Sequence, residues 1–256
     1  MNNSREAIVR PSVMLAALEI MRAGFEGWNL LMSGRMLDAA PHGDGHGVLV
    51  LPGFATGDES TALLRSFLRT LGYDVHPWRL GWNLDHLTVG SEGEHLTREI
   101  DNILRTTGRK VSLVGWSLGG VIAREAARRN PQTVRQVLSI GSPIGGNPQA
   151  NNLGTIYEWL SGNKVNSPAA LRRFELGPQA LSMPSSALFS KTDGITAWQN
   201  CLAIPDHQTE NIEVQSSHFG MLLNPIVFHI IADRLAQAEN AWSPFVSEAQ
   251  NTSLYP

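Results

Sequence analysis

The stretch 111–120 contains a serine in a pattern typical of a nucleophile. A short apolar run is followed by Gly-x-Ser-x-Gly at Gly115–Gly119 and then by a helix-forming run from Val121 to Arg129. At a sharp turn between a strand and a helix, the Oγ of Ser117 stands above the sheet edge, where it can attack a carbonyl carbon. The glycines let strand and helix approach without a Cβ clash. The alternative interpretation is a glycine-rich turn that carries an ordinary serine.

A serine hydroxyl is a weak nucleophile at neutral pH, so it needs a base, and the base needs an acid that orients it. In a chain of alternating strands and helices, these partners are expected in loops after later strands, the acid before the histidine. Asp193 follows the apolar run 187–189, and His218 follows the run 212–215. The spacing therefore predicts a triad of Ser117, Asp193 and His218.

The tetrahedral intermediate of such a reaction needs backbone N–H donors aimed at its oxyanion. One donor is expected from Leu118, the residue after the serine, at the start of the next helix. The other is expected from the loop that follows the first apolar strand, at Phe54 or its neighbour Ala55, and we assign Phe54. A plain tight turn at these residues is the alternative.

Strand and helix patterns alternate along the chain. The first strand run, Val48–Leu51, is wholly apolar, as in a parallel sheet covered on both faces. This alternation predicts one α/β domain over residues 1–256, with a doubly wound, mostly parallel sheet. Further strands are expected at 73–76, 111–114, 134–140, 187–189 and 212–215, and helices at 63–71, from a capping box at Ser91–Glu94, at 121–129 and at 225–237.

The sequence resembles the α/β-hydrolase superfamily, on its lipase and esterase side. The resemblance spans roughly residues 47–238 and depends on the Gly115–Gly120 motif, the Pro-Gly-Phe loop at 52–54, Asp193-Gly194 and the Ser-His-Phe-Gly signature at 217–220. It departs from many relatives in having Pro52 where they have His, and the two antiparallel strands that usually open the sheet are not evident. A shortened sheet is therefore expected.

The resemblance implies a serine carboxylic-ester hydrolase that works through an acyl-enzyme and needs no cofactor or metal. The expected substrate is a small-molecule ester or lipid with a short or medium apolar acyl chain. Two alternatives stay open. The same triad could transfer the acyl group to an alcohol or amine, or the chain could be a non-catalytic scaffold that binds a ligand or partner. An ordered acid behind the histidine favours catalysis, because a binding module has no need of one.

Residues 151–184 differ in composition from both flanks and contain two short helical pieces, around 156–160 and 168–174. A helix pair this short cannot form its own core, so it must rest on the body or on bound substrate. We interpret it as a small helical cap inserted over Ser117. Side chains expected to bind substrate, with core packing as the alternative for the aromatic ones, are Trp116, Ile144, Trp159, Leu160, Phe219 and Met221.

The N-terminal segment 1–40 contains an amphipathic helical pattern from Val13 to Leu37, with apolar residues at three- and four-residue spacing. A break is expected near Gly24 or Gly27. The apolar face is expected to dock on the body or on a second subunit, as in a dimer, or to lie on a membrane surface.

Composition excludes several classes. A net charge of −3 without a basic run argues against nucleic-acid binding, and no apolar run is long enough to span a membrane. Glu19 interrupts the apolar run after Arg10, which argues against a signal peptide, so a cytoplasmic location is expected. The single cysteine, Cys201, excludes an intramolecular disulfide and is expected to fill apolar space.

The loop at 40–47 presents His42, Asp44 and His46, which could be metal ligands. The alternating glycines indicate a flexible turn, however, and no fourth ligand is marked. We therefore expect no metal site.

Overall fold

A six-stranded sheet forms the centre of the molecule, and a computed structural model describes its residues 8–246. The order is β2-β1-β3-β4-β5-β6, and every neighbouring pair is parallel. This arrangement confirms the predicted doubly wound parallel sheet, and no antiparallel strand belongs to it within residues 8–246. The strands are β1 (Gly47–Leu51), β2 (Asp74–Pro77), β3 (Val111–Trp116), β4 (Val134–Ile140), β5 (Ser185–Phe189) and β6 (Thr209–Glu213).

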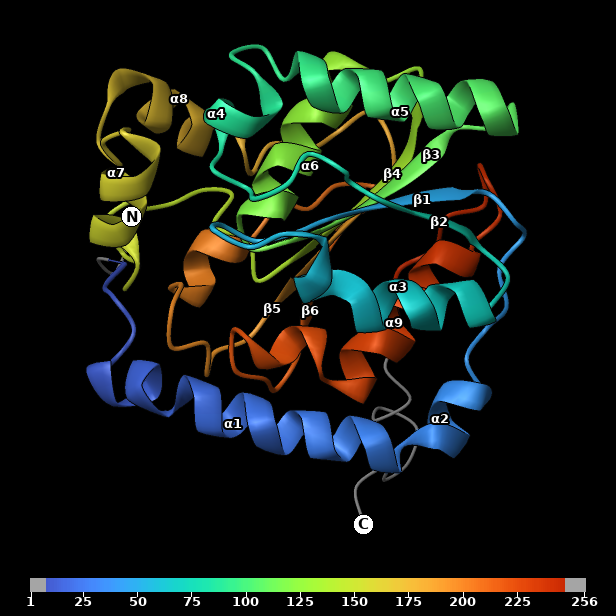
Figure 1. Cartoon of the computed structure of the whole chain (residues 1–256), viewed down its shortest axis with the longest axis horizontal. Helices are drawn as coiled ribbons and strands as arrows, with labels where there is room; N and C mark the ends of the chain where they lie inside the picture. Colours follow the sequence, from blue (N-terminus) through green and yellow to red (C-terminus); the bar gives the residue numbers. More distant parts are fainter. Residues whose placement is uncertain (1–7, 247–256) are drawn as a thin grey trace, which may run out of the picture.

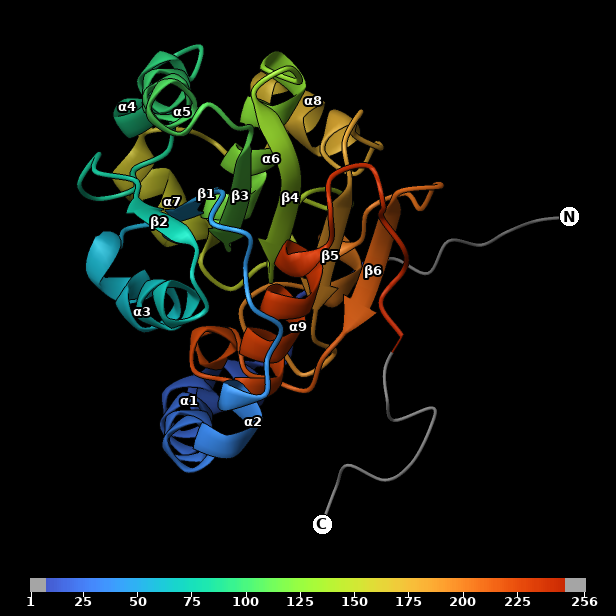
Figure 2. The same ribbon diagram turned by 90° about the vertical axis from the view of Figure 1, so that its right-hand side faces the viewer.

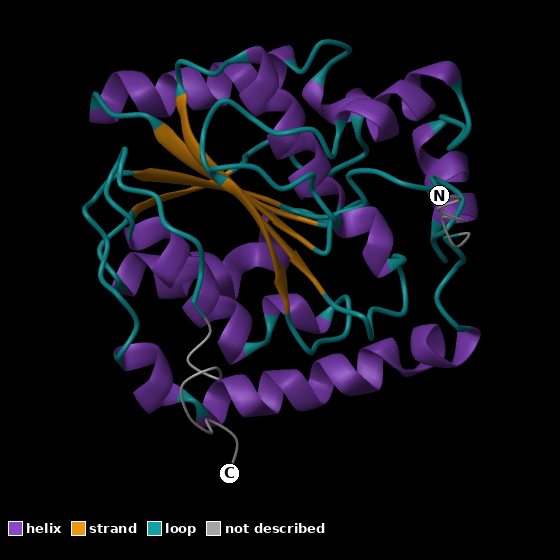
Figure 3. Ribbon diagram, turned by 180° about the vertical axis from the view of Figure 1, so that it is seen from behind, coloured by secondary structure: helices purple, strands orange, loops and turns teal. Residues whose placement is uncertain are grey.

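Helices cover both faces of the sheet, which explains why β1, β3, β4 and β5 are buried along their whole length. One face packs on α5 (Glu94–Thr107) and α6 (Leu118–Arg129), and the other packs on α3 (Ala62–Thr70) and α9 (Pro225–Ala236). Figures 1 and 3 show the twisted sheet between these two layers. Each face therefore has its own apolar core.

Outside these layers lie α1 (Val13–Met32) and α2 (Gly34–Asp38), along the side of α9, as Figure 2 shows. The predicted break near Gly24 or Gly27 is wrong, because α1 continues through both glycines and ends at Met32. Glu19 before Gly24 and Glu26 after it both accept hydrogen bonds from backbone N–H groups of the body, and these bonds hold the helix in place on both sides of the glycine. No helix within residues 8–246 is long and apolar enough to cross a membrane.

The predicted capping box at Ser91–Glu94 is also wrong. The residue before α5 is Gly93, which has a left-handed backbone with φ +72°. The Glu94 carboxylate turns back and accepts a hydrogen bond from the N–H of Glu92 at 3.0 Å. Ser91 therefore makes no cap. Short helical turns lie at Asp58–Thr61 (η1), His86–Val89 (α4), Trp198–Cys201 (η2) and Gly220–Leu222 (η3), and two further helices, α7 (Gly154–Ser161) and α8 (Pro168–Leu176), lie between β4 and β5.

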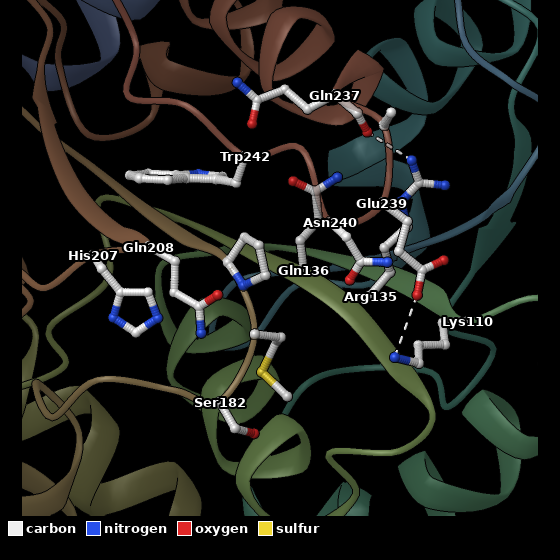
Figure 4. A pocket seen from close by; sticks show the side chains of 13 residues that line it. Lys110, Arg135, Gln136, Ser182, His207, Gln208, Gln237, Glu239, Asn240 and Trp242 are labelled. Carbon is white, nitrogen blue, oxygen red and sulfur yellow. Dashed lines mark hydrogen bonds and ion pairs between the residues drawn. The ribbon is translucent and has the colours of Figure 1, made fainter.

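A polar pocket of about 280 Å³ lies at the amino ends of the strands, opposite the edge that carries Ser117 (Figure 4). Two of its basic side chains are bonded to the segment after α9. Lys110 Nζ lies 3.3 Å from a Glu239 oxygen, and Arg135 donates to the carbonyl of Gln237 at 2.7 Å. These contacts tie the segment after α9 to the sheet.

Candidate active site

Ser117 occupies the turn between β3 and α6 with an unusual backbone conformation, φ +54° and ψ −124°. A non-glycine residue at positive φ is strained and persists only where its surroundings hold it. Here strand and helix approach closely, since a Cβ on Gly115 would lie 2.4 Å from the Gly119 backbone. The Ser117 N–H also donates to the Ile140 carbonyl of β4 at 2.8 Å. The glycine spacing read from the sequence is thus a steric requirement.

Three side chains from separate loops form a hydrogen-bonded line. His218 Nε2 lies 3.0 Å from Ser117 Oγ, and His218 Nδ1 lies 2.6 Å from Asp193 Oδ2. The other Asp193 oxygen accepts hydrogen bonds from the N–H groups of Ile195 and Thr196, at 2.7 and 2.8 Å. The acid is therefore fixed in orientation, and the imidazole is held between acid and serine.

The electrostatics of this line favour the protonated histidine. Burial alone would lower the pKa of His218, but the negative charge of Asp193 and the hydrogen bond to it outweigh that effect, with a further contribution from Glu19. The net result is a raised pKa. An imidazole of this kind accepts a proton from Ser117 more readily than an isolated one.

Two residues that line the cavity beside Ser117, Phe54 and Leu118, have backbone N–H groups without an acceptor among residues 8–246. The N–H of Ala55 donates instead to the Asn83 carbonyl at 2.8 Å. Of the two neighbours, only Phe54 therefore has its N–H available to a ligand. The loop after β1 and the turn between β3 and α6 meet where the strand order reverses, which is the usual position of a ligand-binding site in such a sheet.

Sequence reasoning missed Asn83, which holds the loop carrying Phe54. Its Nδ2 donates to the Pro52 carbonyl at 2.8 Å, and its N–H donates to the Thr56 carbonyl at 2.9 Å. The side chain is fully buried. In the sequence, an asparagine after a strand looks like an ordinary turn residue, so no local signal marks this role.

A cavity of about 100 Å³ lies beside Ser117 and is mostly apolar. The predicted cap, which forms α7 (Gly154–Ser161) and α8 (Pro168–Leu176), supplies one side of it. The body and its loops supply Phe54, Ser117, Leu118, Val121, Pro143, Pro148, Ile195 and Thr196, and the segment 151–184 supplies Asn151, Leu153, Tyr157, Val165, Ala170, Arg173 and Phe174.

The six side chains predicted to bind substrate do not line this cavity. Ile144 and Met221 are buried in the two cores, and Trp116 lies beneath the site, where its Nε1 donates to the His218 carbonyl at 3.1 Å. Phe219 packs against the rings of Trp116 and His218.

The error on the cap is one of helical phase. Leu153 and Tyr157 are four residues apart and share the inward face. Trp159 follows two residues later on the opposite face and is 81% exposed, while Leu160 is half-buried outside the cavity.

An ion-pair network attaches the cap to the body. The Arg173 guanidinium of α8 donates to both oxygens of Asp85, at 2.7 and 2.9 Å, and to both oxygens of Glu125, at 2.6 and 2.8 Å. Tyr157 donates its O–H to the same Asp85 carboxylate. Burial would raise the pKa of Asp85, but the charge and hydrogen bonds of Arg173 lower it overall.

A second serine, histidine and aspartate line occurs near the amino ends of the strands. His46 Nε2 lies 2.7 Å from Ser112 Oγ, and His46 Nδ1 lies 2.5 Å from Asp44 Oδ1. However, Ser112 and His46 are fully buried, and Ser112 lies within the regular strand β3. Burial lowers the pKa of His46, and its neighbours do not outweigh that effect, whereas the net pKa of His218 is raised by Asp193. This line is closed to substrate and ties β1 to β3.

The three side chains weighed as metal ligands, His42, Asp44 and His46, have other surroundings. Asp44 accepts hydrogen bonds from Arg109 and Arg135, at 2.5 and 2.8 Å, and pairs with His46. His42 is exposed. Within residues 8–246, no three side chains of metal-binding type come together.

No protein-family model and no curated protein sequence matches the chain. Its structure is similar to lipase B of Aspergillus fumigatus, with a TM-score of 0.61 and 18% identity over 79% of this chain and 56% of that one. It is also similar to a monoacylglycerol lipase of Paleococcus ferrophilus (TM-score 0.55, 15% identity, 76% and 96% covered) and to lipase BlEst2 of Bacillus licheniformis (0.54, 16%, 78% and 95%). The chain spans little more than half the length of the Aspergillus protein. It has the α/β-hydrolase fold, as the resemblance implied.

Proposed function

We propose that this chain is a serine hydrolase of carboxylic esters that works through an acyl-enzyme on Ser117. The observation that carries the proposal is the line from Asp193 through His218 to Ser117, with the serine held at a strained turn beside an apolar cavity. The buried line at Ser112 has the same side chains but neither the strained turn nor the cavity.

In the first half-reaction, His218 Nε2 takes the proton of Ser117 Oγ while the oxygen attacks the ester carbonyl carbon. The carbonyl oxygen becomes an oxyanion, which the N–H groups of Phe54 and Leu118 stabilise. The tetrahedral intermediate then collapses as its C–O bond to the alcohol breaks, and His218 gives its proton to the leaving alcohol.

In the second half-reaction, water gives a proton to His218 and attacks the acyl carbon. The bond to Ser117 Oγ breaks, and the serine takes back the proton. Asp193 remains ionised throughout, holds the tautomer with hydrogen on Nδ1 and stabilises the imidazolium. No step needs a metal or an organic cofactor.

The cavity suits a short acyl chain. Its volume, about 100 Å³, is below the roughly 300–1,000 Å³ of pockets that enclose drug-sized ligands. We therefore expect turnover of p-nitrophenyl esters to be greatest for short acyl groups. The alternative is that the same side chains transfer the acyl group to an alcohol instead of water. Measuring how the product divides between the free acid and a new ester when alcohol is added distinguishes the two reactions.

Ser117→Ala should lower ester turnover by about 10³-fold or more, because the nucleophile is removed. Ser112→Ala is the matched control, since it removes the same hydroxyl from the buried line and should keep activity within a few-fold of wild type. A fluorophosphonate should label Ser117 in the wild type. Full activity in Ser117→Ala, or labelling at another residue, would contradict the proposal.

A further inference from the structure

Helix α1 turns its charged side chains toward the body of the protein. Glu19 is only 1% exposed. Its Oε1 accepts a hydrogen bond from the N–H of Gly194 at 2.7 Å, and its Oε2 accepts one from the N–H of Phe219 at 3.1 Å. Gly194 follows Asp193 and Phe219 follows His218, so one carboxylate joins the loop of the acid to the loop of the histidine.

Two more side chains on the same face of α1 hold these loops. Arg22 donates to the carbonyl and the Oγ1 of Thr192, at 2.6 and 2.8 Å. Glu26 accepts hydrogen bonds from the N–H and O–H of Ser217, at 2.8 and 2.7 Å. Positions 19, 22 and 26 are three and four residues apart and therefore share one helical face. A buried carboxylate is costly without such partners, so the loops and the helix stabilise each other.

We propose that Glu19 is a positioning residue for the line of Ser117, His218 and Asp193, acting through the backbone of the two loops. This inference rests on the proposed function. Glu19 does not contact Ser117 or the cavity, so its effect on rate passes through the orientation of the acid and the histidine. A misplacement of about 1 Å in such a line can cost roughly a hundredfold in rate.

The charge of Glu19 adds an effect that a purely structural contact lacks. Two charged groups act on His218, Asp193 from the loop after β5 and Glu19 from α1. Arg22 lies 3.9 Å from Glu19, and Glu26 accepts a hydrogen bond from the N–H of Ser217, the residue before His218. Burial lowers the pKa of His218, Asp193 raises it, and Glu19 raises it further. Loss of this charge should therefore move the acid limb of the pH profile to lower pH.

The test compares three variants with p-nitrophenyl acetate. Glu19→Gln has nearly the same size but no charge and only one acceptor oxygen for two N–H donors. It should lower kcat about tenfold to a hundredfold, leave KM nearly unchanged and move the acid limb of kcat/KM downward. Glu19→Asp keeps the charge with a shorter reach, so kcat should fall while the acid limb stays. Glu26→Gln, the matched control at a partly exposed carboxylate on the same face of α1, should lower kcat without moving the limb.

The proposal is overturned if Glu19→Gln has the kcat and the pH profile of wild type. It is also overturned if the acid limb of Glu26→Gln moves as far as that of Glu19→Gln. If circular dichroism shows that Glu19→Gln does not fold, Glu19→Asp decides, since wild-type kcat in that variant also overturns the proposal. A wild-type protein without ester turnover and without fluorophosphonate labelling overturns the proposed function instead.

The outer face of α1 carries an independent observation. Its exposed side chains are almost all apolar, and we call them the apolar stripe. The stripe consists of Val13, Met14, Ile20, Met21, Phe25, Trp28, Leu31 and Met32, each between 57% and 81% exposed. The charged residues of the helix are turned inward, so its amphipathic pattern is reversed relative to an ordinary surface helix. A continuous exposed apolar surface of this kind marks an interaction site.

We infer that the apolar stripe binds a neutral lipid surface. The stripe contains no charged side chain, which matches uncharged or zwitterionic lipid and offers nothing to anionic headgroups. A helix of 20 residues is about 30 Å long and stands out as a single ridge (Figures 1 and 2). Two such ridges would meet along one line, whereas a stable dimer buries roughly 800 Å² per partner. Lipid can surround the whole exposed half of the helix.

The segment just before the stripe contacts the loop at 147–149. The carbonyl of Ile8 accepts a hydrogen bond from Asn147 at 3.0 Å, and Arg10 donates to the carbonyl of Gln149 at 2.8 Å. These residues neighbour Pro148 and Asn151, which line the cavity. The segment that leads into the stripe therefore contacts the loop that borders the cavity.

Flotation with phosphatidylcholine vesicles tests this inference. Wild-type protein should float with the vesicles, and Phe25→Asp or Trp28→Asp should weaken the partition about tenfold or more, because burial of an aromatic side chain is lost. Trp82→Asp, the matched control at an exposed tryptophan outside α1, should float like wild type. Absence of wild-type flotation overturns the inference. A wild-type dimer that Trp28→Asp converts to a monomer, without vesicle binding, assigns the stripe to a second copy instead.

Discussion

Ser117 and Ser112 show that identical side-chain partners do not make identical sites. Both hydroxyls lie within hydrogen-bond distance of a histidine that also contacts an aspartate. Ser117 sits at positive φ beside a cavity, while Ser112 is enclosed in a central strand. The pKa of His218 is raised and that of His46 is lowered. Access, backbone geometry and local charge therefore distinguish the two.

The raised pKa of His218 gives a pH prediction. The free imidazole is the base, so kcat/KM should fall as the pH decreases through this pKa, which lies above the ordinary histidine value near 6.5. In Asp193→Asn the main charge that raises the pKa is lost. The residual activity should be lower by about 10⁴-fold, and the acid limb of its kcat/KM profile should lie at lower pH than in wild type. A pH profile with a good ester, such as the acetate, checks this, and an unmoved limb would contradict it.

At the scale of elements, the cap is held by a few polar contacts to the body, and its inner face forms part of the cavity. Arg173 connects α8 to Asp85 and Glu125, and Tyr157 of α7 bonds to the same Asp85. The Asp85 side chain is buried, so water cannot take the place of Arg173 when that side chain is removed.

Arg173→Met should destabilise the protein by about 3–5 kcal/mol, because it leaves the Asp85 carboxylate buried without its partner. Arg172→Met, at the exposed neighbouring residue, should change stability by less than about 0.5 kcal/mol. Urea unfolding measures both. The folded pKa of Asp85 is lowered, so its contribution is present above the unfolded aspartate pKa near 3.9 and is lost as the pH falls through the folded value. The difference between wild type and Arg173→Met should therefore shrink in acid.

Phe174→Ala should enlarge the cavity and shift the ester profile toward longer acyl chains, by about tenfold in the ratio of octanoate to acetate turnover. Trp159→Ala is the control on the same cap, because Trp159 is exposed and does not line the cavity. Its profile should equal that of wild type. If Trp159→Ala moved the profile and Phe174→Ala did not, the cap would be seated differently from the structure.

At the scale of the whole molecule, the proposed triad and the Phe54 N–H all lie in loops at the carboxyl ends of parallel strands. Phe54 follows β1, Ser117 follows β3, Asp193 follows β5 and His218 follows β6. Helix α1 then packs across the loops of Asp193 and His218 from outside the layers. The site therefore depends on the assembled sheet and on the first helix together.

Because the proposed reaction uses only these side chains, EDTA should leave both ester turnover and the melting temperature unchanged. Loss of turnover with EDTA and its return with zinc would favour the loop of His42, Asp44 and His46 as a metal site. Melting of apo and zinc-treated protein provides the second readout, because bound metal would raise the midpoint.

The sequence by itself determined the sheet and the order of its loops. Apolar runs such as Val48–Leu51 and the glycines around Ser117 are local signals, because burial on both faces and close backbone approach impose them wherever they occur. The positions of Asp193 and His218 followed from parallel topology, since the loops after parallel strands gather at one edge. The structure places these two side chains within hydrogen-bond distance of each other.

Only the tertiary structure decided how the site is supported and lined. The bond of Glu19 to Gly194 and the contact of Arg173 with Asp85 join residues far apart in the chain, and no spacing rule connects them. Glu19 looked like an interruption of an apolar helix, but it is the inward residue, because the loops offer two N–H donors that water would otherwise satisfy. The inward face of the cap depends on the rotation of α7, which its contacts with the body set. Propensity and periodicity describe neighbours along the chain, whereas these choices depend on partners that only the folded chain brings together.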